Sequence, residues 1–375
     1  MREPKYIKAL DTLKGEILSG KYSSRRPIPS LAASCARFGI SRLTAVKVFD
    51  RLKEEGLVSS RVGSGTFVTK SARSRLIGLV IPGIAYASEF FQPIVTELVR
   101  RAKQLDYAIM MDEVRSPRPE EGGRETIEVA ARLIKRRVAG VIYQPLGHSE
   151  QSESVNRRVL AAFSRAHIPV VLLDGDFVPG PQRSAYDLVA IDNVAAGEAL
   201  AAHMAERGAR SFRFLMRRNY GENVMNRARG VRNAVLANWL RWTDRSVVTA
   251  DPLDTSAIRK MMRTAPRPDA IVCENDVLAA GLMKTLGALG YRVPDDVLVA
   301  GFDDVQIARL SSPGITTIRQ PCESIAHTAI DRLIARLSAS DMPPVSFLLP
   351  HALVLRDSTA PVMSRTSRKS KKELK

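Results

Sequence analysis

The chain is poor in cysteine and aromatic residues and has no excess of acidic over basic residues. Its 375 residues include three cysteines, Cys35, Cys273 and Cys322, which are far apart in sequence. None forms a Cys-x-x-Cys pair, and no histidine stands at metal-ligand spacing from a cysteine or another histidine. The pattern therefore predicts reduced, mostly structural cysteines and no metal site.

Long apolar runs and catalytic signatures are also missing. No stretch is long and apolar enough to predict a membrane span, and the first residues lack the apolar core of a secretory signal. We therefore expect a soluble, cytoplasmic protein. The nucleophile elbow Gly-x-Ser-x-Gly, the phosphate loop and the dinucleotide fingerprint Gly-x-Gly-x-x-Gly are absent, which argues against an enzyme and predicts no cofactor.

The formal net charge of +18 is concentrated at the two ends of the chain. Residues 1–75 contain 16 Lys and Arg against 6 Asp and Glu, and residues 364–375 contain 6 against 1. Lys and Arg that neutralise phosphates supply much of the affinity of proteins for DNA, so the N-terminal part is predicted to bind DNA. A membrane surface would attract the same charge, but no membrane segment accompanies it.

The stretch from Gly39 to Val68 predicts a helix followed by a hairpin. Ser41 is a favourable helix N-cap and Gly56 a favourable C-terminal stop. Apolar residues recur at helical spacing on one face of this helix, and the other face is basic. The apolar positions are Val46, Phe49, Leu52 and Leu57, and the basic ones are Arg42, Lys47, Arg51 and Lys53.

Two short extended runs, 57–61 and 66–69, follow the helix and are separated by glycine and serine. An upstream helix near 30–38 and a turn at Gly39 complete a winged helix-turn-helix, whose second helix would enter the major groove. Residues 4–19 form an amphipathic helix expected to pack on this unit. The alternative is a helical hairpin with a solvated basic face. The candidate DNA-binding residues are Arg25, Arg26, Ser30, Ser41, Arg42, Leu43, Thr44, Lys47, Arg61, Gly63, Ser64 and Gly65.

The ordered fragments Pro-Ser, Gly-Ile-Ser-Arg, Glu-Gly-Leu-Val and Gly-Ser-Gly-Thr-Phe-Val resemble the N-terminal domain of GntR-type bacterial regulators over about residues 5–69. The resemblance retains the Ser41-Arg42 pair. Two arginines usual in that family are replaced, one by Ala32 and one by Val46 with Lys47 beside it. The fold is therefore expected to match, whereas the operator is expected to differ from the family's common one.

The hydrophobic pattern of the sequence changes after a basic linker at 70–75. Apolar runs alternate with helical segments from residue 76 onward, which predicts parallel sheets covered on both faces, and the length predicts two α/β lobes. The runs are 77–81, 108–111, 138–143, 169–173, 189–191, 212–216, 270–273, 297–301 and 316–318. The remaining segment, 358–375, is basic without an apolar pattern and is predicted to be disordered.

Several of these fragments resemble the LacI/GalR effector domain in sequence order, over residues 76 to about 357. They include IGLVIP, AGVIYQP, NRARGVRNAV, PDAIVCENDV and SPGITTIRQP. The resemblance implies a type I periplasmic-binding-protein fold, with a first lobe of about 76–180 and 304–320 and a second of about 181–303 and 321–357. A GntR-type reader joined to such a domain resembles the arabinose repressor group. The predicted fold is thus a winged helix-turn-helix followed by a two-lobed, doubly wound α/β domain.

Polar residues that directly follow strands are candidates for ligand binding, because open α/β sheets bind ligands at the carboxyl ends of their strands. Asp174, Asn275 and Asp303 fit this position, and Arg227 lies on a nearby helix. The resemblance implies that these four contact the effector and that Phe90 and Phe91 supply a ring from the first lobe. Carboxylate, amide and guanidinium groups suit the hydroxyls of a sugar.

Each candidate has a structural alternative. Asp303 could cap a turn or a helix, Asn275 or Asp276 could be the N-cap of the following helix, with Asp276 favoured, and Asp174 could pair with the neighbouring lobe. One of the two phenylalanines is expected to pack inward.

Together these features predict a homodimeric transcription regulator, a repressor, that binds a palindromic double-stranded operator under control of a small polar effector, most consistent with a sugar. Two other classes remain open at this stage: a carbohydrate-binding protein without a role in transcription, and a sugar-metabolising enzyme fused to a DNA reader. The basic N-terminal part argues against the first, and the absent catalytic signatures argue against the second.

Overall fold

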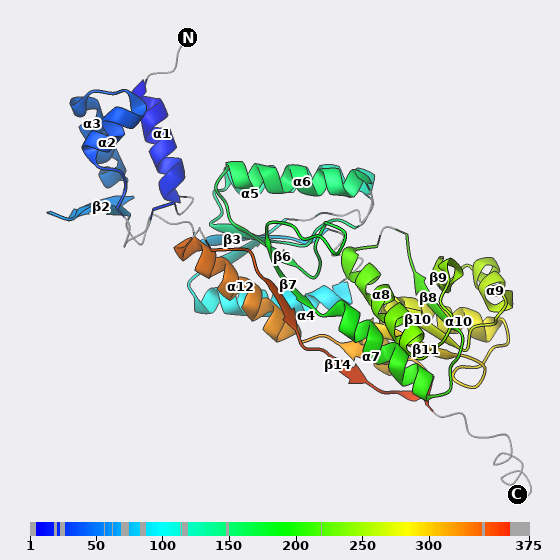
Figure 1. Cartoon of the computed structure of the whole chain (residues 1–375). Coiled ribbons are helices and arrows are strands. Elements are labelled where there is room, and N and C mark those ends of the chain that lie inside the picture. Colours follow the sequence, from blue (N-terminus) through cyan, green and yellow to red (C-terminus); the bar gives the residue numbers. More distant parts are fainter. Residues whose placement is uncertain are drawn as a thin grey trace, which may run out of the picture.

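The computed structural model describes residues 5–18, 21–22, 27–55, 57–61, 63–68, 75–82, 88–112, 114, 119–147, 150–218, 220–339 and 342–360. Arg25, Arg26, Gly56, most of the linker 70–75 and most of the segment 358–375 lie outside these residues, so the predictions made for them are not addressed. Within the described part, a small N-terminal domain precedes two lobes, each built on a six-stranded sheet (Figure 1).

The N-terminal domain is a winged helix-turn-helix, as predicted. Its elements are α1 (Lys5–Leu18), α2 (Leu31–Phe38), α3 (Arg42–Glu54), β1 (Val58–Arg61) and β2 (Gly65–Val68). The turn between α2 and α3 forms at Gly39, whose φ of 60° is left-handed and favours glycine. The two strands pair antiparallel and form the wing.

The buried face of α3 differs in one position from the predicted one. Ala45, Val48 and Leu52 pack inward with Phe49, whereas Val46 is half-exposed. Val46 was therefore wrongly assigned to the core, because the cap at Ser41 begins the helix at Arg42 and turns position 46 away from α1.

Glu16 of α1 ties the helices of this domain together. Its carboxylate accepts hydrogen bonds from Arg37 at 2.5 Å and from Tyr22 at 2.9 Å, and it pairs with Lys21 at 2.5 Å. Although burial opposes ionisation, these three partners lower the pKa of Glu16 to about 2. The domain is thus held by a charge network as well as by its small apolar core.

The first lobe has an all-parallel sheet in the order β13-β7-β6-β5-β3-β4. Helices α5 and α6 cover one face of this sheet, and α4 and α12 cover the other (Figure 1). Its strands are β3 (Leu76–Val80), β4 (Ala108–Met111), β5 (Gly140–Tyr143), β6 (Val170–Leu173), β7 (Asp187–Ile191) and β13 (Ser346–Leu349), and its helices are α4 (Ser88–Gln104), α5 (Pro119–Lys135), α6 (Glu150–Arg165) and α12 (Cys322–Ser338).

The second lobe has the strand order β14-β12-β11-β10-β8-β9, and β14 is its antiparallel member. One face buries a cluster with residues of α7 and α8, the other a cluster with residues of α9 and α10. The strands are β8 (Phe212–Met216), β9 (Val247–Thr249), β10 (Ala270–Cys273), β11 (Leu298–Asp303), β12 (Thr316–Arg319) and β14 (Ala352–Val354); the helices are α7 (Asn193–Glu206), α8 (Glu222–Ala237), α9 (Thr255–Arg263), α10 (Asp276–Ala288) and α11 (Gln306–Leu310), with 3-10 turns η2 (Asp244–Ser246) and η3 (Asp357–Thr359).

The expected division of the chain between the lobes was wrong in three places. Residues 304–320 include β12, which pairs with β11 in the second sheet rather than joining the first. Strand β7 lies in the first sheet, and α12 packs on α4 of the first lobe. The chain therefore crosses between the lobes directly after β7, β12 and β13. Each of these strands lies at or next to the edge of its sheet, and the element that follows it belongs to the other lobe.

The predicted disordered tail also begins too early. Ser358 and Thr359 are buried in η3, where the Ser358 hydroxyl donates to the carbonyl of Val299 at 2.6 Å. These two residues therefore belong to the second lobe.

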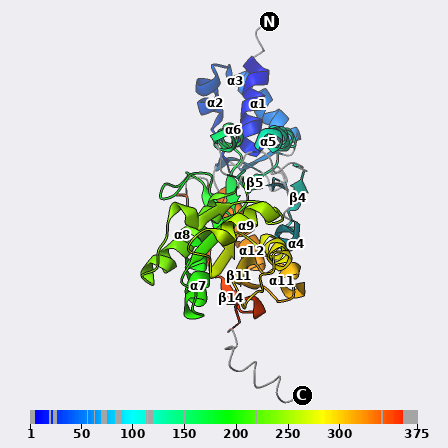
Figure 2. The ribbon, with the colours of Figure 1, turned by 90° about the vertical axis from the view of Figure 1, so that its right-hand side faces the viewer.

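The first lobe lies between the N-terminal helices and the second lobe in both ribbon views (Figures 1 and 2). Among the described residues, no helix combines the length and apolarity needed to cross a membrane. All three cysteines are unpaired.

Candidate effector cleft and DNA-binding surface

A cleft of about 510 Å³ opens where the carboxyl ends of the two sheets face each other. Its walls include residues that follow β3, β5 and β6 in the first lobe and β8, β10 and β11 in the second. This volume is typical of small-molecule sites. The six residues proposed from the sequence all line the cleft: Phe90, Phe91, Asp174, Arg227, Asn275 and Asp303.

Arg227, on the second turn of α8, has partners for all three guanidinium nitrogens. It donates to the Asn193 side chain at 2.9 Å, to the Glu274 carbonyl at 2.6 Å and to Asp303 at 3.4 Å. Its guanidinium lies 4.6 Å from the centre of the Phe302 ring. The side chain is therefore fixed before any ligand arrives, which favours geometric selection of the ligand.

Asp303 and its neighbour Asp304 have different environments. Asp303 ends β11 with φ at 102°, lines the cleft and accepts a hydrogen bond from Gln320 at 2.7 Å. Asp304 instead pairs with Arg319, the last residue of β12, at 2.6 Å and with Arg356, two residues after β14, at 2.5 Å. Neither caps α11, whose N-cap is Val305.

Burial favours the uncharged form of both carboxyl groups, but the net pKa shifts are opposite because their partners differ. Burial raises the pKa of Asp303 despite Arg227, whereas Arg356 and Arg319 hold the pKa of Asp304 below its ordinary value against burial. Asp304 is thus a structural ion-pair residue, and Asp303 is the member that faces the cleft.

Asp174 follows β6 and takes a left-handed φ of 68°, which non-glycine residues rarely adopt outside special sites. Asn223 at the start of α8 donates to its carboxylate at 2.7 Å. The alternative of pairing with the neighbouring lobe is therefore correct, and it coexists with the position of Asp174 in the cleft wall. Burial raises the pKa of Asp174 to about 6, although Arg227 opposes the shift.

Asn275 is the N-cap of α10, not Asp276 as the sequence suggested. The Asn275 side chain accepts a hydrogen bond from the backbone N–H of Leu278 at 2.9 Å. Asp276 is the first residue inside the helix and accepts from the backbone N–H of Val305 at 3.0 Å. Burial and the nearby Asp303 raise the pKa of Asp276 to about 8, so this carboxyl group is mostly uncharged at neutral pH.

Phe90 and Phe91 both belong to the core and both line the cleft. Their ring centres lie 4.8 Å apart in an edge contact, and the residues are 9% and 3% exposed. The expectation that only one of them packs inward was therefore wrong. The pair forms an apolar wall from the first lobe, opposite the polar groups of the second.

Five further polar residues of the site were missed from the sequence. Asn193 and Gln320 hold Arg227 and Asp303; Asn193 lies two residues after β7 and Gln320 directly after β12, so the same strand-end argument would have found them. Glu222 and Asn223 lie about one helical turn before Arg227 and line the cleft, and Glu274 follows β10. Helical spacing back from Arg227 was the available signal for the first two.

Glu222 joins the two lobes at the mouth of the cleft. One carboxylate oxygen accepts from the backbone N–H of Gly180 in the first lobe at 3.0 Å and from Arg229 at 2.5 Å. The other, Oε2, is buried without a hydrogen-bond partner among the described residues. Arg229 is therefore engaged in an ion pair with Glu222.

Two glycines allow α7 and α8 to approach closely. A methyl group on Gly197 would overlap the backbone carbonyl of Arg227, and one on Gly230 would overlap that of Val194. This backbone contact brings Asn193, at the start of α7, within reach of Arg227.

The predicted DNA-reading residues of α3 form one exposed end of that helix. Arg42, Leu43 and Lys47 are exposed, and Leu43 is 70% accessible. The Ser41 side chain accepts from the backbone N–H of Thr44 at 3.2 Å, which confirms its predicted role as N-cap. An exposed helix start of this kind is what major-groove readers present to bases.

The wing and the start of α2 flank this helix end. Gly63 and Gly65 have φ of 73° and 110°, so the tip needs residues without a side chain. Ser64 is exposed between them, and the Arg61 guanidinium lies 4.7 Å from the Phe67 ring centre. Ser30 caps α2 by accepting from Ala33 at 3.2 Å.

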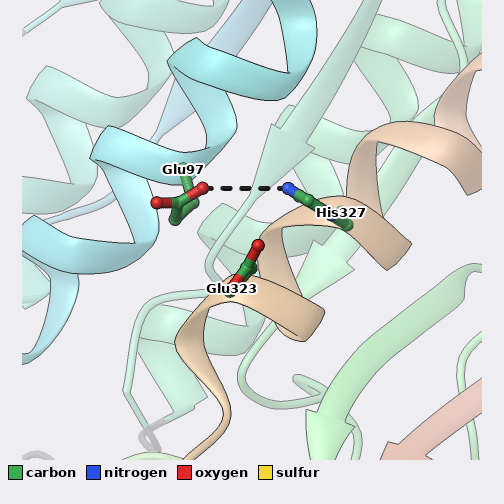
Figure 3. A group of neighbouring side chains, drawn as sticks. All are labelled: Glu97, Glu323 and His327. Atoms are coloured by element: carbon green, nitrogen blue, oxygen red, sulfur yellow. Dashed lines mark ion pairs between the residues drawn. The ribbon is translucent and has the colours of Figure 1, made fainter.

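A side-chain group with metal-ligand chemistry occurs between α4 and α12 (Figure 3). Glu97, Glu323 and His327 offer ligand atoms within 4.8 Å of one another. However, Arg100 donates to Glu97 at 2.7 Å and to Glu323 at 2.8 Å, so its guanidinium already bridges both carboxylates. The group is explained as an ion-pair network between the two helices.

A helix-turn-helix head followed by a two-lobed binding domain defines a ligand-responsive transcription regulator. The family of bacterial regulatory proteins named gntR matches residues 5–68, and the periplasmic binding protein-like domain matches residues 201–359. The chain therefore combines a GntR-type DNA-binding domain with a periplasmic-binding-protein-like effector domain of the LacI type. The matching proteins described next are transcription regulators.

Three similar proteins illustrate this. The arabinose metabolism transcriptional repressor of Geobacillus stearothermophilus is 24% identical over 367 residues, covering 95% of this chain and 98% of that protein. The HTH-type transcriptional repressor PurR of Salmonella newport (strain SL254) is 31% identical over 201 residues, 52% of this chain and 57% of its own. The transcriptional regulator CelR in its cellobiose complex shares the fold, with a TM-score of 0.66 and 24% identity, covering 88% of this chain and 100% of that chain.

Proposed function

We propose that the protein is a cytoplasmic transcriptional repressor whose operator binding is controlled by a sugar held between the two lobes. The observation that carries the proposal is the cleft itself, where Arg227, Asp303, Asp174 and Asn275 converge from the strand ends opposite a phenylalanine wall. Such a wall suits the apolar face of a sugar ring, and the polar groups suit its hydroxyls.

We infer the domain roles from the same architecture. Residues 1–69 bind DNA, residues 70–75 connect the parts, and residues 76–360 form the effector domain. Arg42, Leu43, Thr44 and Lys47 would read bases, and the wing would contact the backbone. Since Ala32 and Val46 replace two arginines usual in GntR-type readers, the operator is proposed to differ from their common one.

One recognition helix contacts only a few base pairs, so the proposed active form is a homodimer on a palindromic operator. The sugar would act by stabilising one arrangement of the lobes. Asn193 and Gln320 lie at two of the three crossovers and bind Arg227 and Asp303. A ligand that contacts Arg227 and Asp303 would therefore also affect the crossovers. A change there would alter the spacing of two DNA-binding heads.

Selection of a binding site from random double-stranded DNA tests the first half of the proposal. We expect an inverted repeat, bound by a dimer in size-exclusion chromatography with light scattering. Absence of specific binding at low salt would reject the DNA-reading role.

The second half is tested on the selected operator. Fluorescence anisotropy in the presence of arabinose, ribose, glucose and cellobiose is expected to show release of the operator by one of them. A regulator that retains the operator with each sugar, while none of them raises its melting temperature, would contradict the sugar-sensing role.

A further inference from the structure

Glu222 is the least explained acidic residue of the cleft. Its side chain is 4% exposed, yet only one of its two carboxylate oxygens has partners. The second oxygen, Oε2, is buried and has no hydrogen-bond partner in the part of the chain that the structure describes. A buried acceptor without a donor costs about 1–3 kcal/mol, and more when charged, so such an atom is expected to meet a donor in the functional state.

The position of Glu222 is fixed from outside the cleft. Arg229, two helical turns further along α8, donates to Oε1 at 2.5 Å, and the backbone N–H of Gly180 donates to the same atom at 3.0 Å. Neither partner lines the cleft, whereas Glu222 does. The carboxylate therefore has one oxygen anchored to the protein and one buried oxygen without a partner among the described residues, in a side chain that lines the cleft.

A second acceptor shares this property. Asp174 uses Oδ2 for Asn223, and its Oδ1 is buried with no well-formed hydrogen bond, although the Gln144 side chain lies close enough to lower the pKa of Asp174. Asn223 is adjacent to Glu222 in sequence, so both acceptors meet at the first turn of α8. The unmet groups of this part of the wall are acceptors, and they call for a ligand that donates.

The arginines of the cleft do not supply donors to these carboxylate oxygens. Arg227 is bound by Asn193, Glu274 and Asp303, and Arg217 pairs with Glu274 at 2.9 Å. Arg218 also lines the cleft but is exposed, where solvent screens its charge. The interior thus presents committed cations and uncommitted carboxylate oxygens.

We propose that Glu222 is a specificity-determining residue that accepts a hydrogen bond from the effector, and that the effector is a polyhydroxylated molecule without a phosphate or carboxylate group. This inference rests on the proposed sugar-sensing function and narrows its ligand class. A phosphorylated or acidic sugar would bring negative charge against the free oxygens of Glu222 and Asp174, with no uncommitted buried cation to balance it.

Paired ligands provide the test on the full-length protein. Thermal shift and calorimetry would compare arabinose with arabinose 5-phosphate, ribose with ribose 5-phosphate, and glucose with glucose 6-phosphate and gluconate. We expect the neutral member of a pair to bind and its anionic derivative to bind at least about 10-fold more weakly, the effect of losing one charged hydrogen bond.

The residue is tested with Glu222→Gln, and Glu206→Gln on the exposed end of α7 removes the same charge outside the cleft as a control. We expect about 10- to 100-fold weaker sugar binding for the first variant and no change for the second. Arg229→Gln, which frees the anchored oxygen but keeps the carboxylate, should cause a smaller loss. Retained operator binding by each variant reports that the protein is folded.

The outcomes separate this inference from the proposed function. Tighter binding of a phosphorylated or acidic sugar, or unchanged binding in Glu222→Gln, overturns the inference but leaves a sugar sensor. Failure of all the sugars and their derivatives to bind rejects the sugar-sensing function and the inference with it.

Discussion

Arg227 and Asp303 form a buried ion pair that joins α8 to the end of β11, with Nη2 of the arginine 3.4 Å from Oδ1 of the aspartate. The side chains are 4% and 10% exposed. Burying such a pair is costly unless further hydrogen bonds satisfy the remaining groups. Asn193, the Glu274 carbonyl and Gln320 supply them, so the pair is ordered in advance of binding.

Replacing Asp303 by alanine should abolish the effector response and leave effector-free operator binding intact. The variant leaves Arg227 buried with fewer compensating charges, which predicts a loss of unfolding free energy of about 3 kcal/mol. Calorimetry measures effector affinity, urea denaturation measures the unfolding free energy, and fluorescence anisotropy measures operator binding with and without the effector. An unchanged affinity for the sugar that binds the wild-type protein would remove Asp303 from the site.

Gln320→Ala should separate sugar binding from sugar response. Gln320 follows β12 at a crossover and contacts Asp303, so its loss removes a connection and no predicted ligand contact. We expect the coupling free energy between sugar and operator to fall by about 1 kcal/mol or more, while sugar affinity changes less. The sugar concentration that releases half of the operator is compared with the sugar affinity measured by calorimetry. If Gln320→Ala changes both by the same factor, Gln320 does not contribute to the coupling.

Sugar affinity should fall as the pH drops below about 6. Burial raises the pKa of Asp174 to about 6, so the uncomplexed carboxylate gains a proton in this range and must release it to accept a sugar hydroxyl. Arg227 and Asp303 face the same group, and burial also raises the pKa of Asp303. Calorimetry between pH 5 and 8 measures the slope, which should be shallower in Asp174→Asn; an equal slope in both proteins would assign the titration elsewhere.

The same shift predicts a stability effect of opposite sign. Because the folded pKa of Asp174 exceeds its ordinary value of 3.8, the stability contributed by protonation is lost as the pH rises through about 6. Asp174→Asn is therefore expected to melt at a higher temperature than the wild type at pH 8, although it binds sugar more weakly.

Arg42→Ala should weaken operator binding by about 1–3 kcal/mol, the range of a direct arginine–base contact. The residue is exposed at the start of α3. Arg51→Ala is the control, because it removes the same charge at the other end of the helix. The Arg51 side chain pairs with Glu54 and Glu55. Equal losses in both variants, measured by anisotropy on specific and scrambled DNA, would mean that Arg42 acts only through its charge.

Gly230→Ala should destabilise the second lobe by about 1–3 kcal/mol through overpacking, since the added methyl group meets the backbone of α7. Gly287→Ala is the control, because that glycine lies in α10 with no atom within 4 Å of an added methyl group. It should stabilise by about 0.5–1 kcal/mol through helix propensity. Thermal unfolding compares them; similar melting temperatures would argue against a tight contact of α7 and α8.

Strand positions were predictable because buried parallel strands are uninterrupted apolar runs. Each of the predicted runs overlaps a strand of the structure. Strands β9, β13 and β14 were missed because they are short edge strands with half-exposed residues, and their apolar stretches are only two or three residues long. The lobe division failed for a different reason: β12 and α12 are consecutive in sequence, and only strand pairing assigns them to different lobes.

The cleft residues divide in the same way. Asp174, Asn275 and Asp303 were found because position after a strand is visible in sequence. Glu222 and Gln320 were not found; sequence position alone could have placed them near the site, but their contacts with Gly180 and Asp303 are visible only in the structure. Local pattern therefore identified the groups that line the cleft, and three-dimensional contacts were needed to identify those that hold them.

The last strands of the chain complete both lobes. Strand β13 forms one edge of the first sheet, and β14, only a few residues later, forms one edge of the second. During synthesis on a ribosome, the DNA-binding head can fold once its own residues have emerged, whereas neither half of the sensor is finished until translation has passed residue 354. A chain terminated prematurely before residue 346 would keep the head and lose the sensor, and it would occupy operators without answering to the metabolite.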